Sequence, residues 1–194
     1  MPQQDSTTVP NFTRSDSRIS ELLDALHTIA DLSSLISLAD WDQNTAMPEG
    51  AAEVRGHQLA AMQGVMHEHW ISTHLGKLIG ELNETVQRPS FSDADRGLLR
   101  EAKRGYDRAT KLPRKLVEEM ARVQSSSFNA WRRAREQNDF ASFAPWLSRT
   151  VAIQREVADR LGFVETRYDA LLDEFEPGIT SRKLDALFVP VRET

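Results

Sequence analysis

The residues with the clearest potential for chemistry are two histidines and a glutamate in the string His67–Ile71, which reads His-Glu-His-Trp-Ile. Zinc peptidases use His-Glu-x-x-His on a helix, where the four-residue spacing puts both imidazoles on one face and the glutamate acts as base. Here Ile71 occupies the second histidine position, and His67 and His69 lie about 200° apart around a helix. His74 shares a face with His67 but lies roughly 10 Å further along the axis, too far to share one ion. These histidines are therefore interpreted as surface or partly hydrogen-bonded helix residues.

Adjacent carboxylates occur at Glu118-Glu119 and at Asp173-Glu174. Neighbouring residues diverge on a helix, so these pairs are expected to be solvent-exposed rather than acid–base partners. A serine nucleophile at positions 125–127 would need a histidine and an acid arranged around it, and the sequence alone cannot place any of these serines beside a histidine. These serines are expected on a helix surface.

Other kinds of catalytic or cofactor site find no support in the sequence. Cysteine is absent, which excludes disulfides, thiolate metal sites and a cysteine nucleophile. Gly76–Gly80 lacks the spacing and the strand-to-helix context of a phosphate loop. His27 and His57 each stand alone. We therefore predict no catalytic, cofactor-binding or metal-binding residue in this chain.

The four tryptophans fall mostly on apolar helical stripes and are expected in the core rather than in a cofactor site. They are Trp41, Trp70, Trp131 and Trp146.

Charge and composition narrow the class of protein. A net charge of −5 with interleaved acidic and basic residues lacks the broad basic face that nucleic-acid binding requires. The densest basic patch, Arg132, Arg133 and Arg135, follows Trp131 and is interpreted as a solvated helix face. No apolar run approaches the roughly 20 residues that cross a bilayer, and the N-terminal sequence lacks the apolar centre of a secretory signal. We expect a cytoplasmic protein that binds neither membranes nor nucleic acid.

Apolar residues recur at spacings of three and four, the pattern of helices with one buried face, and period-two alternation is absent. The pattern predicts an all-α bundle of about seven helices. The segments that carry it are residues 19–38, 51–70, 73–82, 92–111, 113–137, 140–161, 168–175 and 180–191.

The first helix is expected to begin with Ser15 or Ser17 as N-cap. Asp40–Gly50 is interpreted as a connection, because Asn44 and Thr45 are poor helix formers and the proline at position 48 disfavours a helical residue before it.

Further boundaries follow from capping residues. Thr73 is expected to cap a short helix, and Ser92 with the acidic residues after it a longer one. Pro113 suits the first turn of the next helix. Gly162 is expected to end a helix in a left-handed conformation that most residues resist.

The chain is expected to form one domain over residues 17–194, preceded by a polar, mobile arm at residues 1–16. The last helix runs into the C-terminus without a capping signal, so the chain is interpreted as truncated.

Four ordered blocks resemble the N-terminal region of the carboxypeptidase Taq family of metallocarboxypeptidases, and the resemblance covers about residue 19 to the end. The blocks are Asp40–Gln43 with Met47-Pro48, Gly50-Ala51, Arg55 and Gln58–Ala60; Tyr106–Pro113; Trp131–Arg135 with Asn138–Phe140; and Tyr168–Gly178.

This resemblance implies a helical enzyme of roughly 500 residues that uses zinc or another divalent metal to remove single residues from peptide C-termini, typically as a homodimer. The family's His-Glu-x-x-His helix, its third metal ligand and the residues that hold the substrate carboxylate lie downstream of this sequence. The resemblance therefore implies no catalytic or metal-binding residue at any position here. In the family, the N-terminal helices help to wall and cover the substrate groove, so this segment is expected to shape the groove and to be inactive alone.

Two alternatives remain open. The chain could be a free-standing helical protein, derived from that region and used for dimerisation or partner binding. It could also complement a separately encoded catalytic half. Truncation predicts exposed apolar surface and hence self-association, with a homodimer as the expected form.

Overall fold

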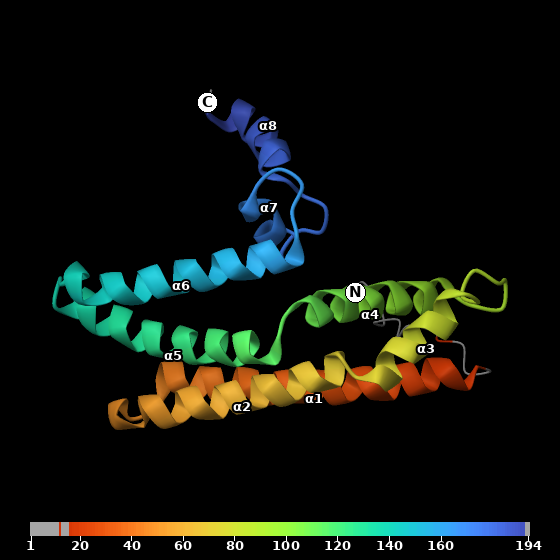
Figure 1. The fold of residues 1–194 in the computed structure, drawn as a ribbon, viewed down its shortest axis with the longest axis horizontal. Helices are drawn as coiled ribbons and strands as arrows, with labels where there is room; N and C mark the ends of the chain where they lie inside the picture. The colour runs from red at the N-terminus through yellow and green to blue at the C-terminus, as the bar shows by residue number, and fades with distance from the viewer. Residues whose placement is uncertain (1–11, 13–15, 193–194) are drawn as a thin grey trace, which may run out of the picture. The chain divides into compact units, whose positions relative to one another are not determined.

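A computed structural model describes residue 12 and residues 16–192 of the chain. These residues contain helices and no strand, so the prediction of an all-α fold is confirmed. Most of the predicted arm at residues 1–16 lies outside the described residues. The helices are α1 Ser17–Thr45, α2 Ala52–Trp70, α3 Thr73–Asn83, α4 Asp93–Lys111, α5 Arg114–Glu136, α6 Phe140–Leu161, α7 Arg167–Leu172 and α8 Ser181–Arg192, with a turn of 3₁₀ helix at Glu49–Ala51 (Figure 1).

The chain forms two compact units. Among the described residues, unit 1 contains those up to Leu35 together with Met66–Thr110, and unit 2 contains Ile36–Val65 together with residues 111–192. Helices α1 and α2 therefore contribute to both units. Helix α3 and all of α4 except its last residue, Lys111, belong to unit 1, whereas Lys111 and α5 to α8 belong to unit 2.

Unit 1 has a continuous apolar core. The predicted stripe of α3 is confirmed, because Leu75, Leu78, Ile79 and Leu82 are all buried. Trp70 and Tyr106 pack against this core from its margin. The core itself consists of Ile19, Leu22, Ile29, Leu75, Leu78, Ile79, Leu82, Val86, Phe91, Leu99 and Ala102.

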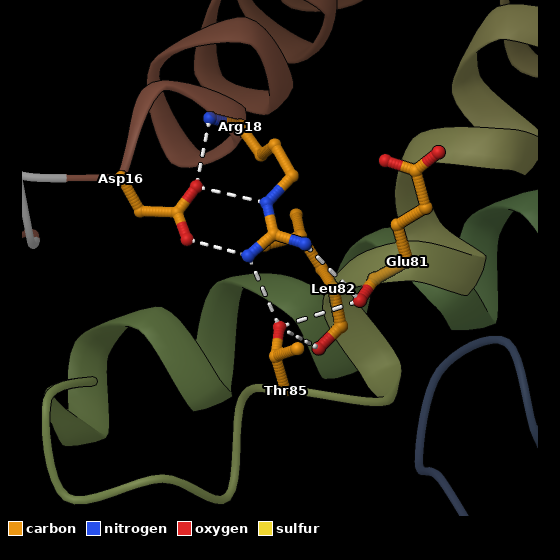
Figure 2. Close-up of polar contacts among 5 residues, drawn as sticks. All are labelled: Asp16, Arg18, Glu81, Leu82 and Thr85. Atoms are coloured by element: carbon orange, nitrogen blue, oxygen red, sulfur yellow. Dashed lines mark hydrogen bonds and ion pairs between the residues drawn. The ribbon is translucent and has the colours of Figure 1, made fainter.

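Arg18 joins the start of α1 to the end of α3 (Figure 2). Its guanidinium donates to both carboxylate oxygens of Asp16, at 2.9 and 2.6 Å, and to the hydroxyl of Thr85 at 3.3 Å. Asp16 also accepts a hydrogen bond from the backbone N–H of Arg18 at 3.0 Å. Asp16 therefore caps α1, and the expectation of Ser17 in that role is wrong, because Ser17 is already the first helical residue. The alternative, Ser15, lies outside the described residues.

Helix α1 extends further than its sequence pattern predicts. The interpretation of Asp40–Gly50 as a connection is wrong for its first half, because α1 continues to Thr45. The amide of Asn44 donates to the carbonyl of residue 40 at 2.8 Å, and the hydroxyl of Thr45 donates to the carbonyl of residue 41 at 2.8 Å. These bonds tie both side chains back to the preceding turn of the helix, which these residue types can do in place of capping it.

Arg55 on α2 supports the same end of α1. Its guanidinium donates to the carboxylate of Asp42 at 2.6 Å and also to the carbonyl of Ala39. The side chain of Arg55 is 16% exposed. This long-range contact stabilises residues that local propensity alone would release from the helix.

The caps of α3 and α4 depend on serine hydroxyls. Ser72 Oγ accepts from the N–H of Leu75 at 3.3 Å, so the N-cap is Ser72, one position before the predicted Thr73, and Thr73 is the first residue of α3. The predicted cap at Ser92 is confirmed: its hydroxyl accepts from the N–H of Asp95 at 3.2 Å. The Asp95 carboxylate accepts in return from the N–H of Ser92 at 2.7 Å, which completes a capping box.

Two residues predicted to mark helix boundaries do so, but in a different position or conformation from the one expected. Pro113 is the N-cap residue of α5 rather than a member of its first turn, with φ −68° and ψ 143°. Gly162 ends α6 with φ 83°, the positive value expected, but its ψ of 150° lies outside the left-handed helical region.

Unit 2 is built on α5 and α6, which run side by side in opposite directions (Figure 1). Leu116, Ile153 and Val157 form the buried centre of their interface. The ammonium of Lys111 donates to the carbonyl of Leu161 at 2.7 Å, which satisfies a carbonyl at the C-terminal end of α6. Helix α7 packs against α6, and α8 packs against α7.

Helix α1 is longer and more apolar than expected from the sequence, which predicted no segment able to cross a bilayer. By length and composition α1 could cross a membrane, with a mean hydropathy of 1.3 over its most apolar 18-residue window, of which 11% is buried. The exclusion of any such segment was therefore too strict. The start of α1 nevertheless packs Ile19, Leu22 and Ile29 into the core of unit 1.

Candidate functional site

His67, the first candidate metal ligand, is a structural residue in unit 1. Its side chain is 5% exposed, and Nε2 lies 3.0 Å from the carbonyl oxygen of Ala109. A carbonyl oxygen can only accept, so Nε2 carries the proton. The carbonyl of Ala109 would normally accept from the N–H four residues later, but residue 113 is proline and has none. His67 therefore replaces a missing helical donor, whereas His69 is exposed.

The described residues do not provide a metal site. Across residues 12 and 16–192, no three side chains of histidine, cysteine, aspartate or glutamate are grouped closely enough to hold an ion. The residues present therefore do not fit a catalytic divalent metal, and we derive no metal-dependent step from them.

The adjacent glutamates of α5 bind separate partners. Glu118 accepts from Nε of Arg114 at 2.6 Å, and this hydrogen bond holds the pKa of its carboxyl below the usual value. Glu119 forms an ion pair with Arg149 of α6. The two carboxylates diverge as predicted, although both are half-buried rather than exposed.

Ser125 departs from the prediction of a surface position. Its side chain is 2% exposed, and its hydroxyl donates to Oε1 of buried Gln43 at 2.6 Å. Neighbouring Ser127 exchanges a hydrogen bond with the hydroxyl of Thr150 at 3.3 Å. These hydroxyls bind side chains of α1 and α6, which gives them a packing role and no histidine partner.

Most tryptophans are not core residues, contrary to the prediction. Trp70 packs against the core of unit 1, but Trp41, Trp131 and Trp146 are 61%, 39% and 38% exposed. Trp131 also packs beside Phe128 and under the guanidinium of Arg135. The apolar stripes locate a helix face but do not tell whether another element covers it.

Unit 2 contains a groove of about 410 Å³ bordered by α1, α2 and α5. Trp41 supplies an exposed aromatic wall, and the amides of Gln63 and Gln124 can each donate and accept hydrogen bonds. The complete lining is Ile36, Ser37, Asp40, Trp41, Asn44, Leu59, Gln63, Ala121, Gln124 and Ser125.

The lining of this groove contains one carboxylate, Asp40, and neither histidine nor cysteine. Its side chains suit an extended polar ligand with apolar groups, such as a peptide main chain. The sequence reading missed Asp40, Trp41 and Asn44 as groove residues because it placed them in a connection. Their helical spacing of three and four would have revealed the shared face had α1 been extended to Thr45.

The comparisons with known proteins agree with one another. The family model described as carboxypeptidase Taq (M32) metallopeptidase matches residues 21–194. Thermostable carboxypeptidase 1 of Thermus thermophilus is 34% identical over 183 residues, which cover 89% of this chain and 36% of that protein.

Solved structures agree with this match. The BsuCP crystal structure has a TM-score of 0.86 at 29% identity, covering 92% of this chain and 35% of that one. Trypanosoma cruzi metallocarboxypeptidase 1 has a TM-score of 0.73 at 31% identity, covering 91% of this chain and 35% of that one. The chain thus spans about a third of the length of these relatives.

Proposed function

The chain belongs to the carboxypeptidase Taq (M32) metallopeptidase family, and on that basis we propose that it is the N-terminal, groove-shaping segment of a metal-dependent carboxypeptidase that releases C-terminal residues from peptides. The observation that carries the proposal is the match to about a third of each relative, in a chain whose described residues lack a group of metal ligands. The groove beside Trp41 and Gln63 supports a peptide-lining role.

The complete enzyme would use zinc or another divalent metal, in keeping with the family's description as metallopeptidases. In such enzymes the metal activates water and polarises the scissile carbonyl. The present chain has no group of side chains that would hold the ion among its described residues, so we expect no hydrolysis by this chain alone.

An assay of C-terminal residue release tests this proposal. The purified chain is incubated with unblocked peptides and added zinc or cobalt, while its metal content is measured in parallel. We expect neither turnover nor stoichiometric metal. Chelator-sensitive release that follows the chain through purification would overturn the proposal.

A second candidate is a free-standing dimerisation or partner-binding protein. Exposed apolar side chains on α8 are expected for such a protein, as they are for a truncated enzyme: Leu187 and Val191 are 65% and 64% exposed. Exposed apolar patches of this kind commonly mark contact surfaces. Light scattering across a concentration series should then show a discrete dimer. A monomer at every concentration, with no binding of an apolar dye, would count against it.

Complementation by a separately encoded catalytic half makes a different prediction. Such a half should co-purify with this chain and restore peptide hydrolysis. A chain that purifies alone from its native source would argue against complementation.

The proposed location is the cytoplasm, without membrane or nucleic-acid binding. Its net charge of −5 disfavours association with polyanions. Cell fractionation tests the location. Recovery in the membrane pellet would contradict it and would indicate membrane association through the apolar helix α1.

A further inference from the structure

A second, smaller pocket in unit 2 has a different chemical character from the groove. It encloses about 210 Å³ between α2, α5 and α6. Its lining contains Ala52, Glu53, Gly56, His57, Arg122, Ser126, Asn129, Arg133 and Trp146. Two arginines and a histidine face one carboxylate here, in a chain whose net charge is negative.

One face of α5 supplies the polar wall of this pocket. Arg122, Ser126, Asn129 and Arg133 recur at spacings of four, three and four, which aligns them along one side of the helix. The two arginines stand at opposite ends of this stripe, about 16 Å apart along the helix axis. The hydroxyl of Ser126 and the amide of Asn129 lie between the two arginines.

The two arginines of the stripe differ from three other arginines on α5 and α6. Arg114, Arg149 and Arg160 each pair with a glutamate. In contrast, neither Arg122 nor Arg133 forms an ion pair with a described residue, although the charge of Arg122 lies close enough to Glu118 to help lower the pKa of that carboxyl. An arginine fork that is not engaged in an ion pair can bind a carboxylate of another molecule.

Asn129 provides an independent indication of a ligand. Its side chain is only 8% exposed, and its amide nitrogen donates to the carbonyl of Ser125 at 2.9 Å. The Oδ1 atom of Asn129 accepts no hydrogen bond from a described residue. It is still open to solvent, because among the described residues the fully enclosed side-chain polar atom without a partner is a different one, Nδ1 of His67. A nearly buried acceptor that lines a pocket can receive an N–H from a ligand.

We infer that this pocket binds an acidic peptide segment carrying two carboxylates. One carboxylate meets Arg122 and the other meets Arg133, since a single compact anion spans about 16 Å of helix less readily than two separated groups do. A main-chain N–H of the peptide donates to Asn129 Oδ1, and Trp146 contacts its apolar portion. The inference requires no hydrolysis, so a failed carboxypeptidase assay would not affect it.

Calorimetric titration of the whole chain tests the assignment. The probe is the capped peptide acetyl-Glu-Ala-Ala-Glu-amide, and the matched control peptide carries glutamine at both glutamate positions. We expect saturable binding of the first peptide only. In the unmodified protein, added NaCl should weaken that binding, because screening reduces attraction between exposed charges.

Three matched variants locate the site. Arg122→Gln and Arg133→Gln should each weaken binding of the acidic peptide about five- to tenfold, as expected for loss of one charge-assisted contact. Arg155→Gln, on the exposed side of α6, should leave it unchanged. Because neither pocket arginine forms an ion pair in the described chain, both variants should retain the helical circular dichroism of the parent.

Several outcomes would overturn the inference. They are equal binding of the glutamine peptide, equal or tighter binding of inorganic phosphate, equal weakening by Arg155→Gln, or the absence of saturable binding below about 10 mM peptide. If a pocket variant loses helical signal, the salt dependence and the peptide comparison still decide the outcome in the unmodified chain.

Discussion

Nε2 of His67 donates a hydrogen bond to the carbonyl oxygen of Ala109 at 3.0 Å, in place of the helical N–H that Pro113 lacks. The imidazole thereby joins the last turn of α2 to the last turns of α4 inside unit 1. His67, whose sequence context suggests a zinc ligand, therefore supplies a hydrogen-bond donor that the end of α4 lacks.

Removing this imidazole should destabilise unit 1. His67→Ala leaves the Ala109 carbonyl without its donor and opens a cavity, for which we expect a loss of about 1–3 kcal/mol in the free energy of unfolding. Urea denaturation followed by circular dichroism measures the loss. His69→Ala is the matched control, because His69 is exposed on the same helix and should change stability by less than about 0.5 kcal/mol. Equal effects of the two substitutions would contradict the role assigned to His67.

The close approach of α4 to Trp70 depends on Gly105. A Cβ atom at Gly105 would overlap the indole ring of Trp70, which is itself packed against the core of unit 1. Gly105→Ala should therefore cost about 1–3 kcal/mol through overpacking, although alanine is the better helix former. Gly80→Ala is the control, since a Cβ there meets nothing within 4 Å. The control should gain about 0.5–1 kcal/mol in denaturant titrations. Stabilisation by both substitutions would show that the indole moves aside freely.

The buried pair Gln43 and Ser125 should stabilise the contact between α1 and α5 in unit 2. Ser125→Ala removes the hydroxyl that donates to Gln43 Oε1 and leaves a buried acceptor unsatisfied, at an expected cost of about 1–3 kcal/mol. Ser148→Ala, on the exposed face of α6, should be nearly neutral. A double-mutant cycle with Gln43→Ala isolates the pair. Additive effects in that cycle would mean that the two side chains do not interact.

Asp169 couples α7 to α8 through its carboxylate. Oδ1 accepts from the N–H and the hydroxyl of Ser181 at 2.7 and 2.8 Å, and Oδ2 accepts from the N–H of Thr166 at 3.1 Å. The hydrogen bonds from Ser181, followed by those from Thr166, hold the pKa of the Asp169 carboxyl below its ordinary value of 3.8. The charged form is therefore favoured in the folded state.

Stability should consequently depend on this carboxylate in a defined pH range. Because the folded-state pKa is lowered, the contribution is fully present above the ordinary value of 3.8 and is lost as the pH falls through the lower folded value. Asp169→Asn should lower the melting temperature at about pH 6, and its difference from the parent should shrink toward about pH 2. Glu176→Gln, an exposed change between the same helices, should show no such pattern. A constant difference from the parent at every pH would contradict the assignment.

The boundaries of the helices show where local sequence suffices. Serine with a following aspartate predicts the start of α4, and Gly162 predicts the end of α6, because these signals act within a few residues. The end of α1 was misplaced, since Arg55 reaches its last turn from another helix. Helix propensity depends on neighbouring residues in the sequence, so it does not account for a hydrogen bond from a residue that only the tertiary fold brings close.

The candidate sites show the same division. The sequence by itself determined the all-α class, most helix spans and the resemblance to metallocarboxypeptidases, because helical periodicity and ordered motifs are properties of neighbouring residues. Only the tertiary structure decided that His67 and Ser125 are buried, that Trp41 is exposed beside a groove, and that Arg122 and Arg133 share a pocket. Burial and pocket formation depend on which helix faces meet, and that choice is made by packing between residues far apart in the chain.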